Sequence, residues 1–202
     1  MTAPTYAAPG ASGDASVGSQ QPSRPGQPMA TTRKRPQGDR GLAREPAMNN
    51  NDVLRSLRFS LELSDDEIAR LVGLGGKSLR AEDVQPRLTR EGEPGMVPCS
   101  SAVLGAFLDG LIRDRRGPPD PSRRPPAPVP LNNNEILKKV RIALELREEQ
   151  MLKIAEVGGQ KLSRSELAAL FRKPNHRHFR PCGNQLLRRF MRGLVKTRRP
   201  TA

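Results

Sequence analysis

The sequence predicts an all-α protein, built from two tandem copies of a four-helix unit, with a disordered N-terminal tail and a Pro-rich linker. Three observations support this prediction. Apolar residues recur at helical spacing, no segment alternates apolar and polar residues as a strand does, and a long segment recurs at a fixed offset of 83 positions. The low apolar content, 35%, is expected to belong mainly to the tail and the linker.

Composition divides the 202-residue chain into five parts. Residues 1–47 lack periodicity and are expected to be disordered, because they cannot bury enough apolar surface to offset their conformational entropy. Seven prolines lie within 113–131 and favour a semi-rigid, extended linker. The helical units are expected at 49–112, here repeat 1, and 132–196, here repeat 2. Residues 197–202 form a short basic tail.

The two repeats align without a gap over 63 positions, which chance does not explain in so short a chain. The alignment pairs short identical segments all along both copies. These are Asn49–Asn51 with Asn132–Asn134, Leu61–Leu63 with Leu144–Leu146, Gly75–Gly76 with Gly158–Gly159, Pro98–Cys99 with Pro181–Cys182, and Gly110–Leu111 with Gly193–Leu194.

The first two helices of each repeat have recognisable ends. The first begins after the asparagine triplet, because Asn is a favoured N-cap and the following Asp52 or Glu135 suits the first turn. The second begins in repeat 1 with a capping box from Ser64 to Glu67. Repeat 2 has Arg147 at the cap, so we expect that helix start to fray more. The Gly–Gly pair ends the second helix, since glycine tolerates a left-handed C-cap.

The third and fourth helices follow in the same order. The third is clearer in repeat 2, where Ser163 to Glu166 forms a capping box. In repeat 1 its equivalent contains Pro86, which is tolerated only near a helix start. The fourth helix begins near Cys99 or Cys182 and carries a long apolar stripe in both copies.

Several of these motifs together resemble one family. The segment Met48–Arg55, MNNNDVLR, resembles the start of the YehS-like family of small bacterial proteins. Residues 97–100 and 107–111 resemble the end of the family's first repeat, and 163–173 and 182–194 the end of its second. The resemblance implies a tandem all-helical protein and brings no known activity or functional residue. It also implies that Met48 is the native start, or that the preceding segment is a dispensable extension.

Composition and charge restrict the environment and the partners. Two cysteines and no secretory signal indicate a reducing, cytoplasmic location, and no apolar run is long enough to span a membrane. The net charge is +14, which admits nucleic acid, an anionic surface or an acidic protein as a partner. That charge is uneven: residues 49–111 carry −3 (7 basic, 10 acidic), whereas 132–194 carry +8 (14 basic, 6 acidic).

The basic residues of repeat 2 form the candidate nucleic-acid-binding site. Arg188, Arg192 and Lys196 follow at intervals of four, with Arg189 alongside, and the three arginines replace Gly, Ala and Asp of repeat 1. Such a one-sided basic surface neutralises phosphates, although the same pattern also fits a solvated helix face. The candidate site comprises Arg172, Lys173, Arg177, Arg180, Arg188, Arg189, Arg192 and Lys196.

Two functions fit this pattern. The first is a non-catalytic nucleic-acid-binding or regulatory protein acting on DNA or RNA. The order of helices is similar to repressor-like helix-turn-helix domains, although the stretch from Leu74 to about Arg80 is longer than their usual turn. The alternative is a helical interaction module, in which acidic repeat 1 docks on basic repeat 2, in cis or in trans, or the repeats bind another protein.

Catalytic and metal sites are weaker interpretations. Cys99 and Cys182 each follow proline at a helix start, where a thiol is either activated or simply a small apolar filler. His176, His178 and Cys182 could offer three metal ligands but lack a fourth, and a basic loop is the alternative. We therefore expect no enzyme, no catalytic residue, no metal, no cofactor, no small-molecule substrate and no membrane partner.

Overall fold

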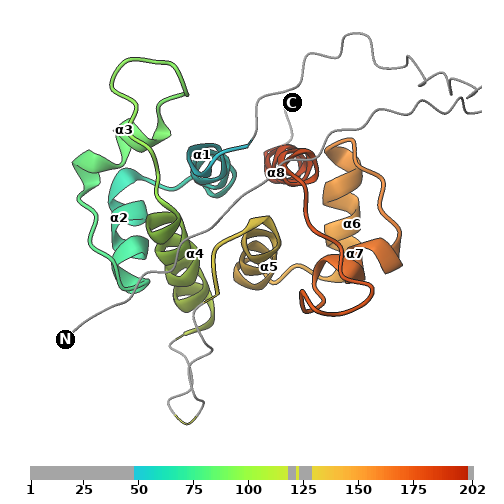
Figure 1. The fold of residues 1–202 in the computed structure, drawn as a ribbon. Coiled ribbons are helices and arrows are strands. Elements are labelled where there is room, and N and C mark those ends of the chain that lie inside the picture. Colours follow the sequence, from blue (N-terminus) through green and yellow to red (C-terminus); the bar gives the residue numbers. More distant parts are fainter. Residues whose placement is uncertain (1–47, 118–121, 123–128, 200–202) are drawn as a thin grey trace, which may run out of the picture. The chain divides into compact units, whose positions relative to one another are not determined.

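The computed structural model describes residues 48–117, 122 and 129–199, and across them the chain is helical with no strand (Figure 1). The predicted all-α fold class is confirmed. The elements are α1 Asn50–Leu61, α2 Asp65–Leu74, a 3-10 turn Ala81–Asp83, α3 Gln85–Leu88, α4 Ser101–Arg116, α5 Asn133–Ala143, α6 Glu148–Val157, α7 Arg164–Leu170 and α8 Asn184–Arg198. The tail predicted to be disordered, most of the Pro-rich linker and residues 200–202 lie outside the described residues.

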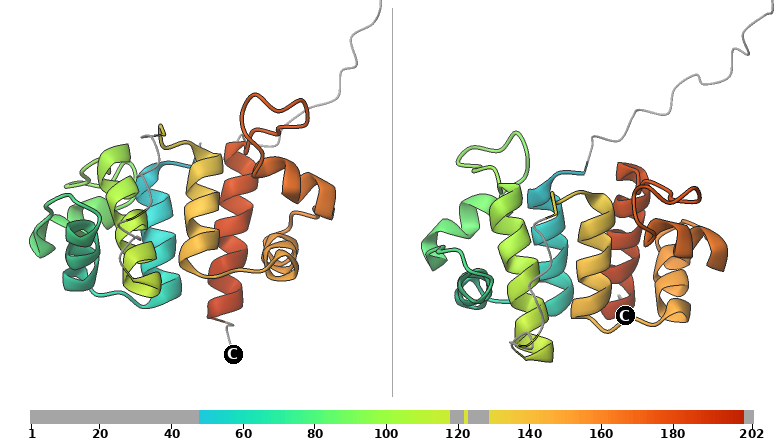
Figure 2. Two further views of the ribbon diagram at one scale, coloured as in Figure 1. Left: turned by 90° about the horizontal axis from the view of Figure 1, so that it is seen from below. Right: turned by 60° about the horizontal axis from the view of Figure 1, so that its bottom comes forward.

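The repeats do not form two separate bundles. The first helix of each repeat packs on the last helix of the other, so that α1 lies against α8 and α4 against α5. These four helices stand side by side, with α2 packed outside α4 and α6 outside α8 (Figure 2). Within a repeat, α1 and α4 share fewer contacts than α1 and α8 do across the two repeats. Each repeat therefore completes its core with a helix from its neighbour.

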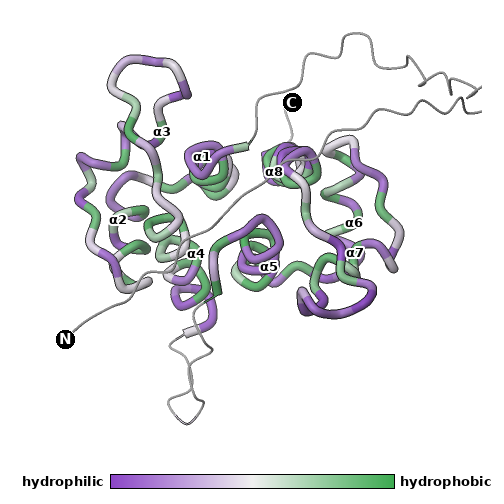
Figure 3. Tube along the Cα trace, in the orientation of Figure 1, coloured by the Kyte–Doolittle hydropathy of each residue, from purple (hydrophilic) through white to green (hydrophobic). Residues whose placement is uncertain are grey.

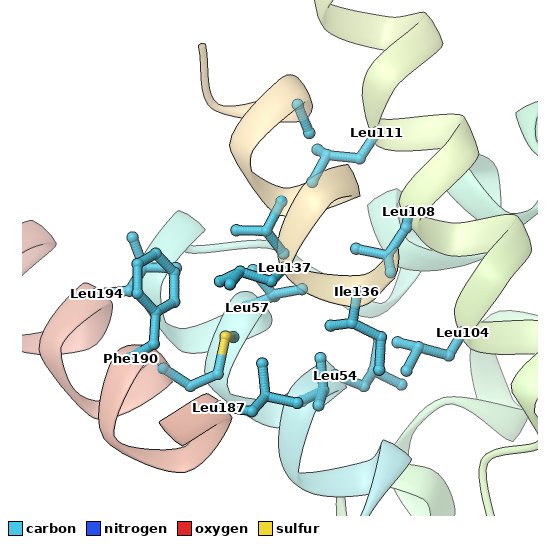
Figure 4. Packing of buried hydrophobic residues seen from close by; sticks show 14 of the residues in the cluster. Leu54, Leu57, Leu104, Leu108, Leu111, Ile136, Leu137, Leu187, Phe190 and Leu194 are labelled. Carbon is cyan, nitrogen blue, oxygen red and sulfur yellow. The ribbon is translucent and has the colours of Figure 1, made fainter. Parts of the chain in front are cut away.

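One hydrophobic core runs through both repeats. The apolar stripes of the helices turn inward, and the polar residues face outward along the same helices (Figure 3). Leu54 and Leu57 of α1 lie among Leu187 and Phe190 of α8, with Leu137 of α5 close by (Figure 4). All five side chains are at most 1% exposed. Burial of such side chains contributes about 1.5–3 kcal/mol each to folding, so the contact between repeats is a major part of the stability.

The helix starts follow the predicted capping pattern, with one correction. The Asn49 side chain accepts a hydrogen bond from the Asp52 amide at 2.9 Å. Ser163 likewise caps α7 by accepting from the Glu166 amide at 3.2 Å. The box predicted to be lost at Arg147 is only half lost. Its side chain cannot accept, but its backbone N–H donates to Oε1 of Gln150 at 2.8 Å.

The asparagine triplet does more than cap a helix. The side chain of Asn51 donates to the carbonyls of Arg87 and Val97, at 2.9 and 2.8 Å, and accepts from the amide of Cys99 at 2.9 Å. Asn50 donates to the carbonyl of Cys99 at 2.9 Å. The triplet thus fastens the start of α1 to the segment between α3 and α4.

The equivalent bonds recur in repeat 2. Asn134 donates to the carbonyls of Leu170 and Arg180 and accepts from the amide of Cys182, with all three bonds between 2.8 and 2.9 Å. Asn133 donates to the carbonyl of Cys182 at 3.0 Å. The α7–α8 loop, which carries half of the candidate site, is therefore anchored at its C-terminal end by α5.

The paired glycines have two different roles. Gly76 has φ of +89°, the left-handed conformation predicted at the helix end, whereas Gly75 is right-handed. A Cβ on Gly75 would overlap the Ala106 backbone of α4, and one on Gly110 would overlap the Leu71 carbonyl of α2. The same crossing recurs between α6 and α8 at their equivalent glycines. At these crossings the backbones of the two helices are therefore in direct contact, with no side chain between them.

The third helix is short in both repeats. In repeat 1 it is one turn, Gln85–Leu88, preceded by the 3-10 turn and with Pro86 in its first turn as predicted. In repeat 2 it is α7, with seven residues. Of the helices in the described part of the chain, none is long and apolar enough to cross a membrane.

Candidate nucleic-acid interface

The α7–α8 loop carries four exposed cations of the candidate site, and three of them, Arg172, Lys173 and Arg177, are called the loop group here. The loop is ordered by its own contacts: Nδ1 of His176 accepts from the His178 amide at 3.1 Å and lies 3.4 Å from Nη1 of Arg172. This end of repeat 2 therefore presents several positive charges on a loop that is held by internal contacts.

Arg180, in the same loop, has a structural contact. Its Nη1 lies 2.6 Å from Oε1 of Glu166, at the start of α7. The backbone N–H of Ser163 and then Arg180 lower the pKa of Glu166 to about 2, so the carboxylate stays charged at neutral pH. Arg180 therefore joins the loop to α7, and its charge is partly neutralised.

The second part of the site is one face of α8. Arg188 is half-buried, and Arg192 and Lys196 are exposed. Because they recur every four residues, they lie in a row about 12 Å long. Arg199 follows Arg188 by eleven residues, about three helical turns, and therefore lies on the same side. Because Arg199 contacts the end of α1, the row is on the side of α8 that adjoins α1.

Arg189 lies apart from this row. Its Nη1 donates to the carbonyl of Gly159 at 3.2 Å and to Oε1 of Gln160 at 3.1 Å, so it contacts the C-terminal end of α6. The helix dipole favours a cation at that position. The structure thus divides the eight predicted residues into the loop group, the α8 row, and two arginines, Arg180 and Arg189, that contact α7 and the end of α6.

Two residues next to the α8 row were not predicted. Arg199 lies over the ring of Phe59, 4.6 Å from its centroid, and its Nη2 is 2.9 Å from Oε1 of Glu62. Phe59 is 52% exposed on α1. The sequence shows Phe59 on the polar side of an amphipathic helix, which could have marked it as exposed. Its position beside α8 could not be predicted, because that position depends on the packing between the repeats.

The two cysteines are part of the interior. Cys99 and Cys182 are buried, and burial raises the pKa of each thiol to about 11. A thiol with this pKa stays protonated at neutral pH, and the structure therefore favours the small apolar filler over the activated nucleophile.

The histidines face solvent. The rings of His176 and His178 have centroids 5.7 Å apart, whereas Cys182 is buried. Within the described residues, no three His, Cys, Asp or Glu side chains are grouped so that they could hold a metal ion.

Comparison with known sequences places this architecture in a family. The family model described as "Protein of unknown function (DUF1456)" matches residues 50–117 and 133–199. The chain belongs to the DUF1456 family. One relative, "Uncharacterized protein YehS" of Escherichia coli (strain K12), is 38% identical over 154 residues, which cover 73% of this chain and 95% of the relative. The resemblance found in the sequence is confirmed. No solved structure matches the chain.

The DUF1456 matches coincide with the structural repeats. The first runs from the start of α1 to the residue after α4, and the second from the start of α5 to the residue after α8. The DUF1456 unit is therefore the four-helix repeat, and its second copy includes the whole α8 row together with Arg199.

Proposed function

We propose that this DUF1456 protein is a non-catalytic, cytoplasmic protein that binds nucleic acid through repeat 2. The observation that carries the proposal is the difference between two equivalent helices. Arg188 and Arg192 of α8 occupy the positions of Gly105 and Asp109 of α4. The two helices hold equivalent places in the two repeats, so the packing that the repeats share also accommodates residues other than arginine there. A row of cations along one helix face is suited to neutralising phosphates.

The loop group supports the same proposal. It adds three exposed cations at the N-terminal end of α8, about 20 Å from Lys196 along the helix. Contacts spread over this length suit a nucleic-acid backbone better than a small anion. The short third helices do not support a groove-reading element of the helix-turn-helix kind, so we place the contact on the α8 row and the loop.

A double charge reversal tests the proposal. Arg192→Glu with Lys196→Glu is expected to abolish binding to mixed DNA and RNA oligonucleotides, measured by fluorescence anisotropy at about 50 mM salt. Arg115→Glu with Arg116→Glu, on exposed positions of α4, is the matched control and should bind as the wild type does. Absence of binding by the wild type, or equal losses in both variants, would contradict it.

A second candidate is an interaction module. The observation that favours it is the exchange of helices between repeats, because a second copy of the chain could supply the same partners to α1 and α5. Across the contact, Lys139 of α5 pairs with Asp109 of α4, and Arg199 with Glu62. Light scattering tests pairing between two copies of the chain: a dimer mass would support pairing in trans, and a monomer at all concentrations would exclude pairing in trans.

A further inference from the structure

Phe59 is an unusual residue for its position. It is the one phenylalanine of the described chain that is strongly exposed, at 52%, whereas Phe107 and Phe190 are fully buried. An exposed aromatic ring presents a flat apolar face to solvent, on which another planar group can stack.

The ring lies at one end of a row of cations. Arg199 covers one side of it and is held there by Glu62, while Arg192 and Lys196 continue the positive charge along α8. We call this surface the α1–α8 face. Its members are Asp52, Ser56 and Phe59 on α1, Arg188, Arg192 and Lys196 on α8, and Arg199 directly after α8.

The repeat supplies an internal comparison. The same relation between α5 and α4 creates an equivalent α4–α5 face, in which Ile142 takes the position of Phe59 and the Asp109–Lys139 ion pair takes the position of Arg192 and Ser56. The scaffold therefore occurs twice, and an aromatic ring beside a continuous row of cations occurs on one of the two faces.

We propose that the α1–α8 face binds single-stranded nucleic acid, with a base stacked on the exposed part of Phe59 and phosphates along the α8 cations. This inference rests on the proposed function and extends it by naming the substrate class and a contact in repeat 1. An aromatic ring stacks on any unpaired base, whereas a duplex keeps its base faces covered. The cations beside the ring would bind the phosphates of the same strand.

A substitution taken from the protein's own repeat tests the stacking. Phe59→Ile installs the residue that repeat 2 carries at this position and removes the ring. It is expected to weaken binding of a 15-nucleotide single strand about tenfold, with little change in the salt dependence, because the phosphate contacts remain. Ile142→Ala on the α4–α5 face is the matched control and should leave the affinity unchanged.

A fluorescent variant tests directly whether a base stacks at position 59. The chain contains no tryptophan, so Phe59→Trp introduces a single tryptophan, whose fluorescence can be excited selectively, at the site. Stacking of a base on its indole is expected to quench the fluorescence when single strand is added, and to quench it much less with the matching duplex. The full chain is used in every measurement.

The outcomes separate the two proposals. Binding of single strand and duplex with equal affinity, without quenching of Phe59→Trp and without loss in Phe59→Ile, would overturn this inference and leave the proposed function standing. Failure of the wild type to bind any nucleic acid would overturn both. Equal quenching by an acidic polypeptide would also overturn the inference, because it would make the face a general polyanion site.

Discussion

At the residue scale, each member of the asparagine triplet has a separate task. Asn49 caps α1, Asn50 holds the Cys99 carbonyl, and Asn51 is buried with three hydrogen bonds to residues 36 to 48 positions away. Only the first task could be predicted, because capping is local. The other two depend on a loop that is brought to α1 by the fold.

Asn51→Ala is expected to destabilise the protein by about 2–4 kcal/mol, because three backbone groups lose their partner in a poorly hydrated place. Asn50→Ala, at a more accessible position, should cost about 1 kcal/mol. Urea denaturation followed by circular dichroism measures both. Equal effects of the two substitutions would contradict the assigned role of Asn51.

Also at this scale, the eight predicted basic residues fall into the loop group, the α8 row, and Arg180 and Arg189, which contact Glu166 and the end of α6. Sequence spacing identified the row because its period is that of a helix. It could not show that α6 ends beside Arg189, or that Phe59 lies beside Arg199. Both facts belong to tertiary packing.

At the element scale, the closest contacts are the crossings of α2 with α4 and of α6 with α8. Glycines allow the backbones to touch, and Gly110 and Gly193 are the residues of the last helices that make this possible. The sequence predicted the glycine pair as a helix end, which is correct for Gly76. It could not reveal the role of Gly110, because that role requires knowing which helices cross.

Two glycines of α4 provide a matched test. Gly110→Ala is expected to destabilise the protein by about 1–3 kcal/mol, since its Cβ would overlap the Leu71 carbonyl. Gly105→Ala should instead stabilise it by about 0.5–1 kcal/mol, because its Cβ has room and alanine favours the helix. Thermal unfolding measures the opposite signs. A loss in both variants would contradict the proposed crossing.

At the scale of the whole molecule, hydrophobic periodicity and capping motifs predicted the eight helical segments, and identities at an offset of 83 positions predicted the internal repeat. Periodicity predicted which side of each helix is apolar, but not which other helix that side packs against. The sequence alone is equally compatible with two self-contained bundles and with the exchange of first helices that the structure shows. The third helix of repeat 1 is shorter than its counterpart because Pro86 and the 3-10 turn limit it.

The exchange predicts how the protein responds to cleavage between its repeats. A protease site introduced within 118–128 should yield two fragments that remain together in size-exclusion chromatography, because the α1–α8 and α4–α5 contacts bury core residues such as Leu57 and Leu137. Leu57→Asp should release them. Fragments that separate after cleavage of the wild type would show that the linker, and not the core, holds the repeats together.

The pairing of α1 with α8 has a consequence for synthesis on the ribosome. Among the described helices, the first, α1, packs on the last, α8, so part of the apolar surface of α1 has no partner until α8 has been synthesised. At typical elongation rates that interval is on the order of ten seconds. Contacts between such distant segments also slow the search for the native state. The nascent chain is thus a natural client for chaperones that cover apolar helices, and truncated products of this protein should be prone to aggregation.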